Sequence, residues 1–382
     1  MKEFTFSIPQ KIIVGKGALE KVGQISVDLD GKHAFIISGP NLEKMGIVSK
    51  VEGLLNEVSI DADSYTNIEA NPSVTTVEKA AKAFIESKAD YIVALGGGSP
   101  LDVAKAVAVV AKYGGSITDY EGAHKVPGKV IPMIAIPTTA GTGSEVTAFS
   151  VITDHIRDYK LTVFSYELIP NYAILDQNLI MTTPASVAAA CGIDAFIHAE
   201  ESYISRDASP FTEAMSEKAM ELIGRSIRAF VADRENQKAA EDMLVGSLFA
   251  GIAFSWARLG NVHAMSHPVS AYFDVPHGVA NGILLPTIVN YNSSVDEGKY
   301  LKIYNYISEE PVTKEQFQPK MLTEAIRNLN AELGIPDGLA AVGVKEEYIK
   351  AMAKDAMKSG NIMANPRKTE YEDIIELYKE AM

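Results

Sequence analysis

Tyr91-Ile-Val-Ala-Leu95-Gly96-Gly97-Gly98-Ser99-Pro100-Leu-Asp102-Val-Ala-Lys105 is the stretch that decides the fold of this chain. A short apolar, β-branched run leads through three glycines into a run typical of a helix. We expect Ser99 to be the N-cap, Pro100 the first helical residue and Asp102 the acid of a capping box. This order of strand, glycine turn and helix is the unit that builds parallel α/β sheets.

The three glycines also predict an anion site. They let backbone N–H groups approach a ligand closely, and the N-terminus of the next helix adds a partial positive charge. The simplest ligand is the pyrophosphate of a dinucleotide, although the spacing matches neither the usual dinucleotide fingerprint nor a Walker loop. A tight structural turn with an ordinary helix cap explains the same residues equally well.

Strands and helices alternate through the first half of the chain. Strand patterns cover His33–Ser38, Tyr91–Leu95 and Ile131–Ile136, and helix patterns cover Thr75–Glu86 and Pro100–Lys112. This alternation predicts a parallel sheet with helices on both faces. Phe149–Ile152, Lys160–Phe164 and Tyr172–Leu175 then follow as strands without long helices between them, which indicates antiparallel additions.

The pattern changes after Thr182-Thr-Pro184. Helical periodicity dominates from there, at Ala185–Ile204, Ser209–Val231, Asn236–Ala257 and Met321–Leu333. We therefore predict two domains in the 382 residues: an α/β dinucleotide-binding domain over residues 1–182 and an all-helical metal-binding domain over residues 183–382.

Composition narrows the function classes. A net charge of −14 argues against nucleic acid or an anionic membrane as a partner. The sequence has no run of eighteen apolar residues and no apolar N-terminal segment, so we expect neither a membrane span nor a signal peptide. Cys191 is the single cysteine, which fits a reducing cytoplasm, and its simplest interpretation is a small buried apolar residue.

Five side chains that can bind a metal gather in the second half of the chain: Asp194, His198, His263, His267 and His277. The first two and the next two have i,i+4 spacing, which puts each pair on one helical face, whereas His277 follows a proline and precedes a glycine at a predicted bend. Imidazole and carboxylate suit a divalent transition metal, and a buried aspartate without a cation would be costly. Four ligands plus a substrate oxygen would leave one histidine free, and spacing does not say which one.

Taken together, four motifs resemble the iron-containing (group III) alcohol dehydrogenases. These motifs are Gly96–Lys105, Ile136-Pro-Thr138-Thr139-Ala-Gly141-Thr142-Gly-Ser-Glu-Val-Thr147, Gly192–His198, and His263–Pro268 with Pro276–Asn281. The resemblance implies the dehydroquinate synthase-like architecture of an α/β domain followed by a helical domain, and a homodimer or larger homo-oligomer. It also implies that Asp194, His198, His263 and His277 bind Fe²⁺, or Zn²⁺ in some relatives, and that His267 stays unligated close to the nicotinamide.

The same resemblance implies a set of residues in contact with the cofactor: Asn71, Gly98, Ser99, Thr138, Thr139, Thr147 and Lys160. The two loops add Gly96, Gly97, Asp102 and Thr142 as candidates. Gly39 follows the strand at His33–Ser38, where NAD-dependent members resemble one another in having an aspartate. Because an acid there would repel a 2′-phosphate, we expect NADPH to be accepted or preferred. Alternatively, Gly39 only makes the turn and NAD binds through other contacts.

We therefore predict reversible, metal-dependent hydride transfer between NAD(P)(H) and a small primary alcohol or diol and its aldehyde, with His267 as a candidate catalytic group. Two other functions fit parts of the pattern. One is a non-redox metal- and NAD-dependent enzyme resembling dehydroquinate synthase, which would need Lys and Arg around an anionic substrate, whereas only Arg258 is near the histidines in sequence. The other is a nucleotide-binding sensor, which would not need five metal-capable side chains.

Overall fold

A computed structural model describes residues 4–157 and 159–382 of the chain. Within them the chain forms two compact units. The α/β unit contains residues 7–139 and 143–182, and the helical unit contains residues 4–6, 140–142 and 183–382. The two short segments of the helical unit come from the first half of the chain, which the sequence did not predict. The functional division of the chain at residue 182 stays a prediction.

The α/β unit contains a six-stranded parallel sheet, counted over the described residues, in the order β1-β9-β6-β4-β2-β3. Its strands are β1 (Lys11–Val14), β2 (His33–Ile37), β3 (Asp61–Tyr65), β4 (Tyr91–Gly96), β6 (Met133–Pro137) and β9 (Tyr172–Leu175). The parallel sheet is confirmed. The antiparallel assignment of Tyr172–Leu175 was wrong, because β9 pairs in parallel with β1 and β6. All four residues of β9 are buried, as expected for a parallel strand covered on both faces.

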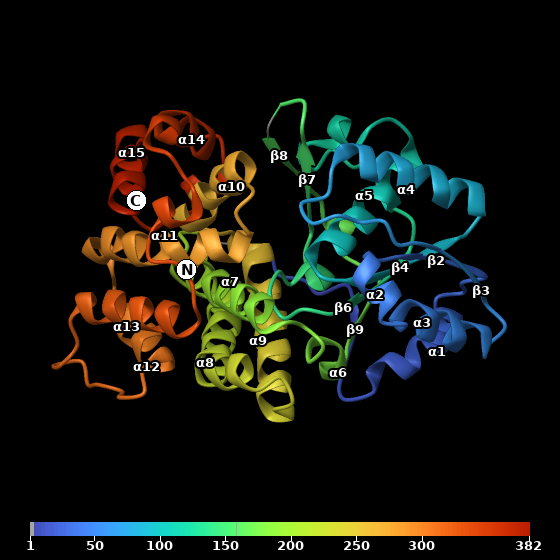
Figure 1. Cartoon of the computed structure of the whole chain (residues 1–382), viewed down its shortest axis with the longest axis horizontal. Coiled ribbons are helices and arrows are strands. Elements are labelled where there is room, and N and C mark those ends of the chain that lie inside the picture. The colour runs from blue at the N-terminus through green and yellow to red at the C-terminus, as the bar shows by residue number, and fades with distance from the viewer. Residues whose placement is uncertain (1–3, 158) are drawn as a thin grey trace. The chain divides into compact units, whose positions relative to one another are not determined.

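Helices cover both faces of this sheet. They are α1 (Val22–Asp28), α2 (Pro40–Lys44), α3 (Ile47–Asn56), α4 (Val74–Ser87), α5 (Gly98–Tyr113) and α6 (Gln177–Ile180). Successive side chains of β2 point to opposite faces, so Phe35 and Ile37 enter one core and Ala34 and Ile36 enter the other. Figure 1 shows α4 and α5 over the first face and α1 and α3 over the second.

A second, smaller sheet contains β5 (Gly122–Ala123), β8 (Tyr159–Phe164) and β7 (Phe149–Asp154), in that order. Strands β7 and β8 are antiparallel, with Phe149 opposite Phe164. The two phenyl rings stack with centroids 4.7 Å apart. The predicted antiparallel strands at Phe149–Ile152 and Lys160–Phe164 are therefore confirmed, in a separate sheet.

The order of the main sheet marks where a ligand is expected. After β2, the chain places β3 on one side of it and β4 on the other. Ligands of open α/β sheets bind at the carboxyl ends of the strands where the order reverses. Gly39 follows β2 and the Gly96–Gly98 loop follows β4, so both predicted cofactor segments belong to this point of the fold.

The start of α5 differs from the prediction. Its N-cap is Gly97 and its first helical residue is Gly98, so the assignment of Ser99 as N-cap was wrong. Pro100 is tolerated in third place because the first N–H groups of a helix have no intrahelical partner. The Asp102 carboxylate does not cap α5, because it accepts hydrogen bonds from Ser144 Oγ at 2.7 Å and from the Val151 N–H at 3.1 Å.

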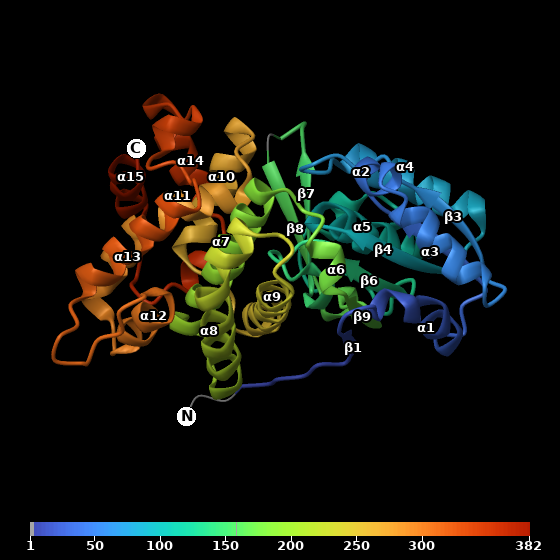
Figure 2. The same ribbon diagram turned by 60° about the horizontal axis from the view of Figure 1, so that its bottom comes forward.

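The helical unit has no strand in residues 183–382, all of which are described. Its helices are α7 (Ala185–Ile204), α8 (Pro210–Ala232), α9 (Gln237–Ala257), α10 (Asn261–Phe273), α11 (His277–Asn292), α12 (Lys299–Ile307), α13 (Pro319–Glu332), α14 (Ile349–Ala356) and α15 (Tyr371–Glu380). Figure 2 shows them from a second side. Helices α7, α8, α9 and α13 correspond closely to the predicted ranges, and the all-helical prediction for this part of the chain is confirmed.

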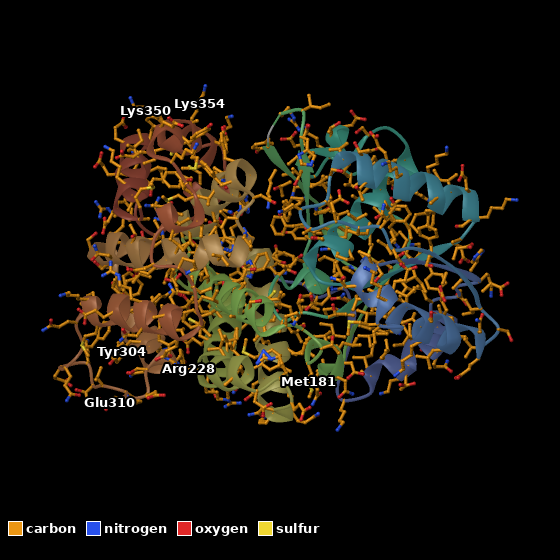
Figure 3. All side chains as sticks on the ribbon, viewed as in Figure 1. Met181, Arg228, Tyr304, Glu310, Lys350 and Lys354 are labelled. Carbon is orange, nitrogen blue, oxygen red and sulfur yellow. The ribbon has the colours of Figure 1, made fainter. Side chains whose placement is uncertain are left out.

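Polar side chains connect α12 and α13 to α8 within this unit. Arg228 of α8, labelled in Figure 3, donates a hydrogen bond to the Ile307 carbonyl at the end of α12 at 3.0 Å, and it also pairs with Glu332 of α13.

Among the described residues no single helix is long and apolar enough to cross a membrane. Helices α9 and α10, which are bent by 103° relative to each other, reach the necessary length and apolar composition only as a pair.

Candidate metal centre and cofactor loops

Helix α7 carries two of the predicted ligands. Asp194 and His198 lie one turn apart on it and are 3% and 5% exposed. Their closest side-chain atoms, Asp194 Oδ1 and His198 Nε2, are 3.9 Å apart. Most of the other buried residues of α7 are small or apolar, so the sequence buries a carboxylate and an imidazole inside a helical core.

Helix α11 approaches α7 closely enough to add a third group. His277 is its first residue and Pro276 its N-cap. Gly278 was predicted to make a flexible bend, and this was wrong because it is helical and buried. A Cβ on Gly278 would lie 2.0 Å from the Ala190 carbonyl oxygen, so glycine is required where the two helices touch. This contact brings His277 Nε2 to 3.9 Å from Asp194 Oδ1.

Helix α10 supplies the fourth group from its first turn. His263 is 2% exposed, and its Nε2 lies 3.6 Å from Asp194 Oδ1. The ligand atoms of Asp194, His263 and His277 all lie within 4.8 Å of one another, a spacing that could hold a metal ion. His198 stands beside this group rather than within it: its ring stacks on His263 with centroids 4.6 Å apart.

Asn281 shows why a cation fits here. Its side-chain nitrogen lies 2.6 Å from Asp194 Oδ1, 3.1 Å from His263 Nε2 and 3.2 Å from His277 Nε2. An amide nitrogen has two hydrogens and can satisfy at most two of these three atoms. The amide nitrogen therefore does not account for the convergence of all three atoms. A divalent metal with nitrogen and oxygen ligands would bind all three at once.

The charges within the group agree with this interpretation. Burial would raise the pKa of Asp194, but His198 and the hydrogen-bonded His263 hold it well below its ordinary value. Burial would lower the pKa of His263, but hydrogen bonds to Asp194 and Glu201 raise it to about 9. The surroundings thus favour a positive charge at His263 Nε2. A metal ion would replace the proton there.

His198 experiences the opposite balance. Burial lowers its pKa to about 4, and Asp194 offsets this only in part. Its ring lies between those of His263 and Phe254, the latter with centroids 4.4 Å apart. Its Nδ1 is 3.3 Å from the Gly141 carbonyl oxygen. His198 is therefore a neutral imidazole at pH 7, which is the form that binds metals.

His267 lies next to this group. Its ring centroid is 5.3 Å from that of His277 and 6.5 Å from that of His263. Its ring nitrogens are not part of the group formed by the ligand atoms of Asp194, His263 and His277. The geometry is compatible with the expected unligated histidine, and its catalytic role stays a prediction.

Two residues of the site were missed by sequence reasoning. Glu201 accepts a hydrogen bond from His263 Nδ1 at 2.6 Å, and Asn281 contacts three of the proposed ligands. A periodicity signal existed for both. Glu201 is seven residues after Asp194 and Asn281 four residues after His277, which are same-face spacings on a helix.

The α/β unit contains the predicted cofactor residues except Thr142, which belongs to the segment that groups with the helical unit. Asp102 lies in the α/β unit, but its carboxylate already accepts hydrogen bonds from Ser144 Oγ and the Val151 N–H. By contrast, Asn71 and Lys160, which are far apart in sequence, meet: Lys160 Nζ donates to Asn71 Oδ1 at 2.8 Å.

The glycine loop after β4 has the close backbone approaches that its sequence predicts. Gly96 has a φ of +152°, and a Cβ on it would lie 2.6 Å from Pro100 Cγ. Gly97 lies against Thr139, whose Oγ1 would be 3.3 Å from an added Cβ. The Thr138 N–H donates to the Gly96 carbonyl at 2.9 Å, so the loops that contain Gly96–Gly98, Thr138 and Thr139 are adjacent. Ser99 lies in the first turn of α5.

Beneath these loops lies a buried lysine. Lys105 Nζ, which has three hydrogens, lies 2.8–3.0 Å from four oxygen acceptors: Ser144 Oγ, the Thr147 hydroxyl, the Thr147 carbonyl and the Phe149 carbonyl. Burial lowers the pKa of Lys105 to about 8 even though Asp102 and Glu145 oppose the shift. Lys105 thus holds the segment from Ser144 to Phe149, and the Thr147 side chain is engaged with it.

The chain also resembles known proteins along nearly its whole length. The family described as "Iron-containing alcohol dehydrogenase" matches residues 9–177, and "Fe-containing alcohol dehydrogenase family, C-terminal" matches residues 188–382. The chain is 38% identical over 381 residues to the 1,3-propanediol dehydrogenase of Citrobacter freundii, covering 99% of this chain and 98% of that protein. It is 37% identical over 374 residues to the lactaldehyde reductase of Escherichia coli (strain K12), covering 96% of each.

Two further comparisons concern cofactor and fold. The chain is 34% identical over 378 residues to the NAD-dependent methanol dehydrogenase of Bacillus methanolicus, covering 99% of each. The crystal structure of a 1,3-propanediol oxidoreductase matches all of both chains with a TM-score of 0.95 and 36% identity. The resemblance seen in the sequence motifs is therefore confirmed. The chain belongs to the iron-containing alcohol dehydrogenase family and is an oxidoreductase of that class.

Proposed function

We propose that this enzyme interconverts a small primary alcohol or diol and its aldehyde, using a nicotinamide dinucleotide and a divalent metal. The observation that carries the proposal is the convergence of Asp194, His263 and His277 on one point within 4.8 Å, in a chain of this family. The names of its relatives, which act on 1,3-propanediol and lactaldehyde, support a small substrate.

Four residues would hold the metal: Asp194, His198, His263 and His277. The carboxylate and the three imidazoles suit iron, as the family name implies, and zinc equally well. When bound, the metal supplies Lewis-acid polarisation of the substrate oxygen. Asp194 contributes the negative charge that offsets that of the cation, and the low pKa of His198 keeps its nitrogen available as a neutral ligand.

The cofactor would bind to the α/β unit. The Gly96–Gly98 loop and the N-terminus of α5 would hold its pyrophosphate, because glycine backbone and helix N-terminus together favour an anion. Gly39, Asn71, Thr138, Thr139, Thr147 and Lys160 remain candidate contacts. The family's NAD-dependent alcohol chemistry supports this assignment.

We also propose that NADPH is accepted or preferred. Gly39 has a φ of −97°, which any residue adopts, so the turn after β2 does not require glycine. A Cβ at Gly39 would meet nothing closer than the Ile68 carbonyl oxygen at 3.9 Å, so an aspartate would fit. Its absence leaves the 2′-phosphate of NADPH without a like charge beside it.

The cofactor proposal is tested with the variant Gly39→Asp. Aspartate should lower kcat/KM for NADPH by at least about tenfold, and leave kcat/KM for NADH equal or higher, because a carboxylate repels a phosphate and hydrogen-bonds a ribose. Gly53→Asp, on the neighbouring helix α3, is the control because a Cβ there meets no atom within 4 Å. A wild-type enzyme that strongly prefers NADH would contradict the proposal.

The reaction itself is tested by following NAD(P)H absorbance with propanal or lactaldehyde. The iron-loaded enzyme should turn over, and chelator-treated protein and His263→Ala should not. Retained turnover in metal-free protein would reject the metal-dependent mechanism. Family membership does not favour the two alternatives, a non-redox enzyme of the dehydroquinate synthase type and a nucleotide sensor. Neither would oxidise NAD(P)H with these aldehydes.

We further propose a homodimer or larger homo-oligomer in the cytoplasm. The oligomer follows from the resemblance to the family, and the location from the single cysteine, which fits a reducing compartment. Light scattering coupled to size-exclusion chromatography measures the mass directly. A mass equal to that of one chain, 41.2 kDa, would contradict the oligomer.

A further inference from the structure

Glu201 joins two helices of the helical unit at the candidate metal centre. It lies on α7 and is 2% exposed. Its Oε1 accepts a hydrogen bond from the Val262 N–H at 2.7 Å, and its Oε2 accepts one from His263 Nδ1 at 2.6 Å. Helices α7 and α10, which carry these residues, both pack against α11 (Figure 1).

The first of these bonds replaces a helix cap. The N-cap of α10 is Gly260, which has no side chain to accept the first N–H groups of the helix. Val262 is the second residue of α10, and its N–H is one of those groups. A carboxylate in this place is also favoured by the helix dipole. The Glu201 carboxylate is therefore held in place by contacts with both of the residues that begin this turn of α10, Val262 and His263.

Gly260 makes room for this arrangement. A Cβ on Gly260 would lie 2.9 Å from Glu201 Oε1 and 2.9 Å from Asn365 Oδ1. Any side chain at this position would push against the carboxylate. The glycine thus allows an acid from α7 to enter the space that an ordinary capping side chain would fill.

The second bond fixes the orientation of His263. With Nδ1–H donated to Glu201, the ring directs Nε2 toward Asp194 Oδ1, 3.6 Å away. A metal-binding histidine depends on such an acceptor for its ring orientation and for the electron density at its ligating nitrogen. We propose that Glu201 is a positioning residue for the metal: by accepting His263 Nδ1–H, it sets His263 Nε2 as the ligand and raises the affinity of the centre for a divalent cation.

This inference rests on the proposed function, because it assumes a metal at Asp194 and His263. Its test is the affinity of metal-stripped protein for Co²⁺ and Zn²⁺, measured by competition with a chelator, together with the absorption bands of the Co²⁺ protein. Glu201→Gln should weaken the affinity by about 10–100-fold, because its amide N–H₂ opposes one of the two donors that the carboxylate accepts. The Co²⁺ bands should change as well.

The matched control is Glu200→Gln. Glu200 is the preceding residue on α7 and is 1% exposed, so the two variants remove similar buried carboxyl groups. Its substitution should change neither the affinity nor the Co²⁺ bands. If Glu201→Gln does not fold, Gly260→Ala presses on the same carboxylate and should weaken metal binding in the same direction.

The outcomes separate the two claims. Wild-type affinity and unchanged bands in Glu201→Gln, or in Gly260→Ala where that variant is used, would overturn the positioning role and leave the proposed function intact. An equal loss in Glu200→Gln would also overturn it, because the effect would then follow from any buried carboxyl of α7. A wild-type protein that binds neither cation would overturn both claims.

Discussion

Each unit of the molecule contains a buried cluster of charged side chains, and the two clusters differ in the groups that they bring together. In the α/β unit, Lys105 Nζ has four oxygen acceptors within 3.0 Å. In the helical unit, Asp194 Oδ1 and the Nε2 atoms of two histidines converge on a single amide nitrogen of Asn281. The first cluster is built around an ammonium group of the chain, whereas the second brings together a carboxylate and imidazoles, the donor set of a divalent metal.

This difference separates a structural cluster from a ligand site. A buried charge is tolerated when its partners lie in the protein, and removing one partner is then costly. A buried carboxylate and imidazoles whose ligand atoms converge on one point can instead hold an external metal ion. We therefore expect changes in the Lys105 cluster to alter stability and changes in the Asp194 cluster to alter metal binding.

The largest effect is expected for Asp194→Asn. Loss of the negative charge should weaken metal binding by more than about 100-fold, because substitution of residues that only hydrogen-bond to metal ligands already weakens it by about 10–100-fold. Turnover should fall as metal is lost. Metal content after dialysis and kcat with an aldehyde substrate measure both. Asp242→Asn is the control because Asp242 is equally buried but is paired with Arg225 and Ser226. Equal metal loss in both variants would break the comparison.

Lys105→Met should produce the opposite result. Without the ammonium group, the acceptors of Lys105 lose their donor and Asp102 loses its nearest cation, at a cost of about 3–5 kcal/mol in the free energy of unfolding. Metal content per folded chain should stay that of the wild type. Urea denaturation measures the free energy of unfolding, and metal analysis measures the metal content. Lys112→Met, on the exposed end of α5, is the control. Loss of metal at full stability would contradict the account.

Glu145 gives the α/β cluster a pH dependence. Burial raises the pKa of Glu145 from 4.5 to about 7, although its own backbone N–H and Lys105 oppose the shift. Between these pH values the folded chain retains a proton that the unfolded chain has released, so stability falls as pH rises from about 4.5 through 7. Glu145→Gln should remove up to about 3 kcal/mol of that fall.

Urea midpoints at pH 5 and pH 7 measure this effect. Glu86→Gln, an exposed substitution on α4, should leave the wild-type difference unchanged. The prediction fails if Glu145→Gln loses as much stability over this range as the wild type does.

The smallest effect concerns the junction before α10. Arg258 has φ 60° and ψ −177°, a backbone conformation that belongs almost entirely to glycine. Arg258→Gly should stabilise the helical unit by about 1 kcal/mol, because the strain disappears. Arg258→Ala retains the Cβ and therefore should not stabilise it. Thermal denaturation compares the two variants, and equal stabilities would show that the backbone carries no strain.

The main elements of the fold could be predicted because their periodicity is strong. Helix α7 has the predicted bounds, Ala185–Ile204, and the parallel sheet follows from the order of strands and helices. Strand β3, Asp-Ala-Asp-Ser-Tyr, lies at the edge of the sheet and is polar, so periodicity gave no signal for it. The direction of β9 could not be read from its own residues, because direction depends on which strands lie beside it.

The candidate site was predictable in its ligand types and not in its supporting contacts. Histidine and aspartate at helical spacing indicate a metal. Glu201 has the same-face spacing, but its residue type is usually solvated on a helix, so the spacing alone did not mark it. Glycine is required at Gly278 because an added Cβ would lie 2.0 Å from the Ala190 carbonyl oxygen, at a contact between helices far apart in sequence. Ser99 resembled an N-cap because the sequence does not show that glycine residues extend α5 toward its N-terminus.

The central claim, that Asp194, His198, His263 and His277 hold a catalytic metal, is tested most directly by anomalous X-ray diffraction at the iron edge. Crystals of active enzyme prepared with Fe²⁺ should show one peak per chain at bonding distance, about 2.0–2.2 Å, from Asp194 and the Nε2 atoms of His198, His263 and His277. His198 should move toward the metal to complete the set. An active crystal without a peak at these atoms, or with its iron bound elsewhere, would contradict the account.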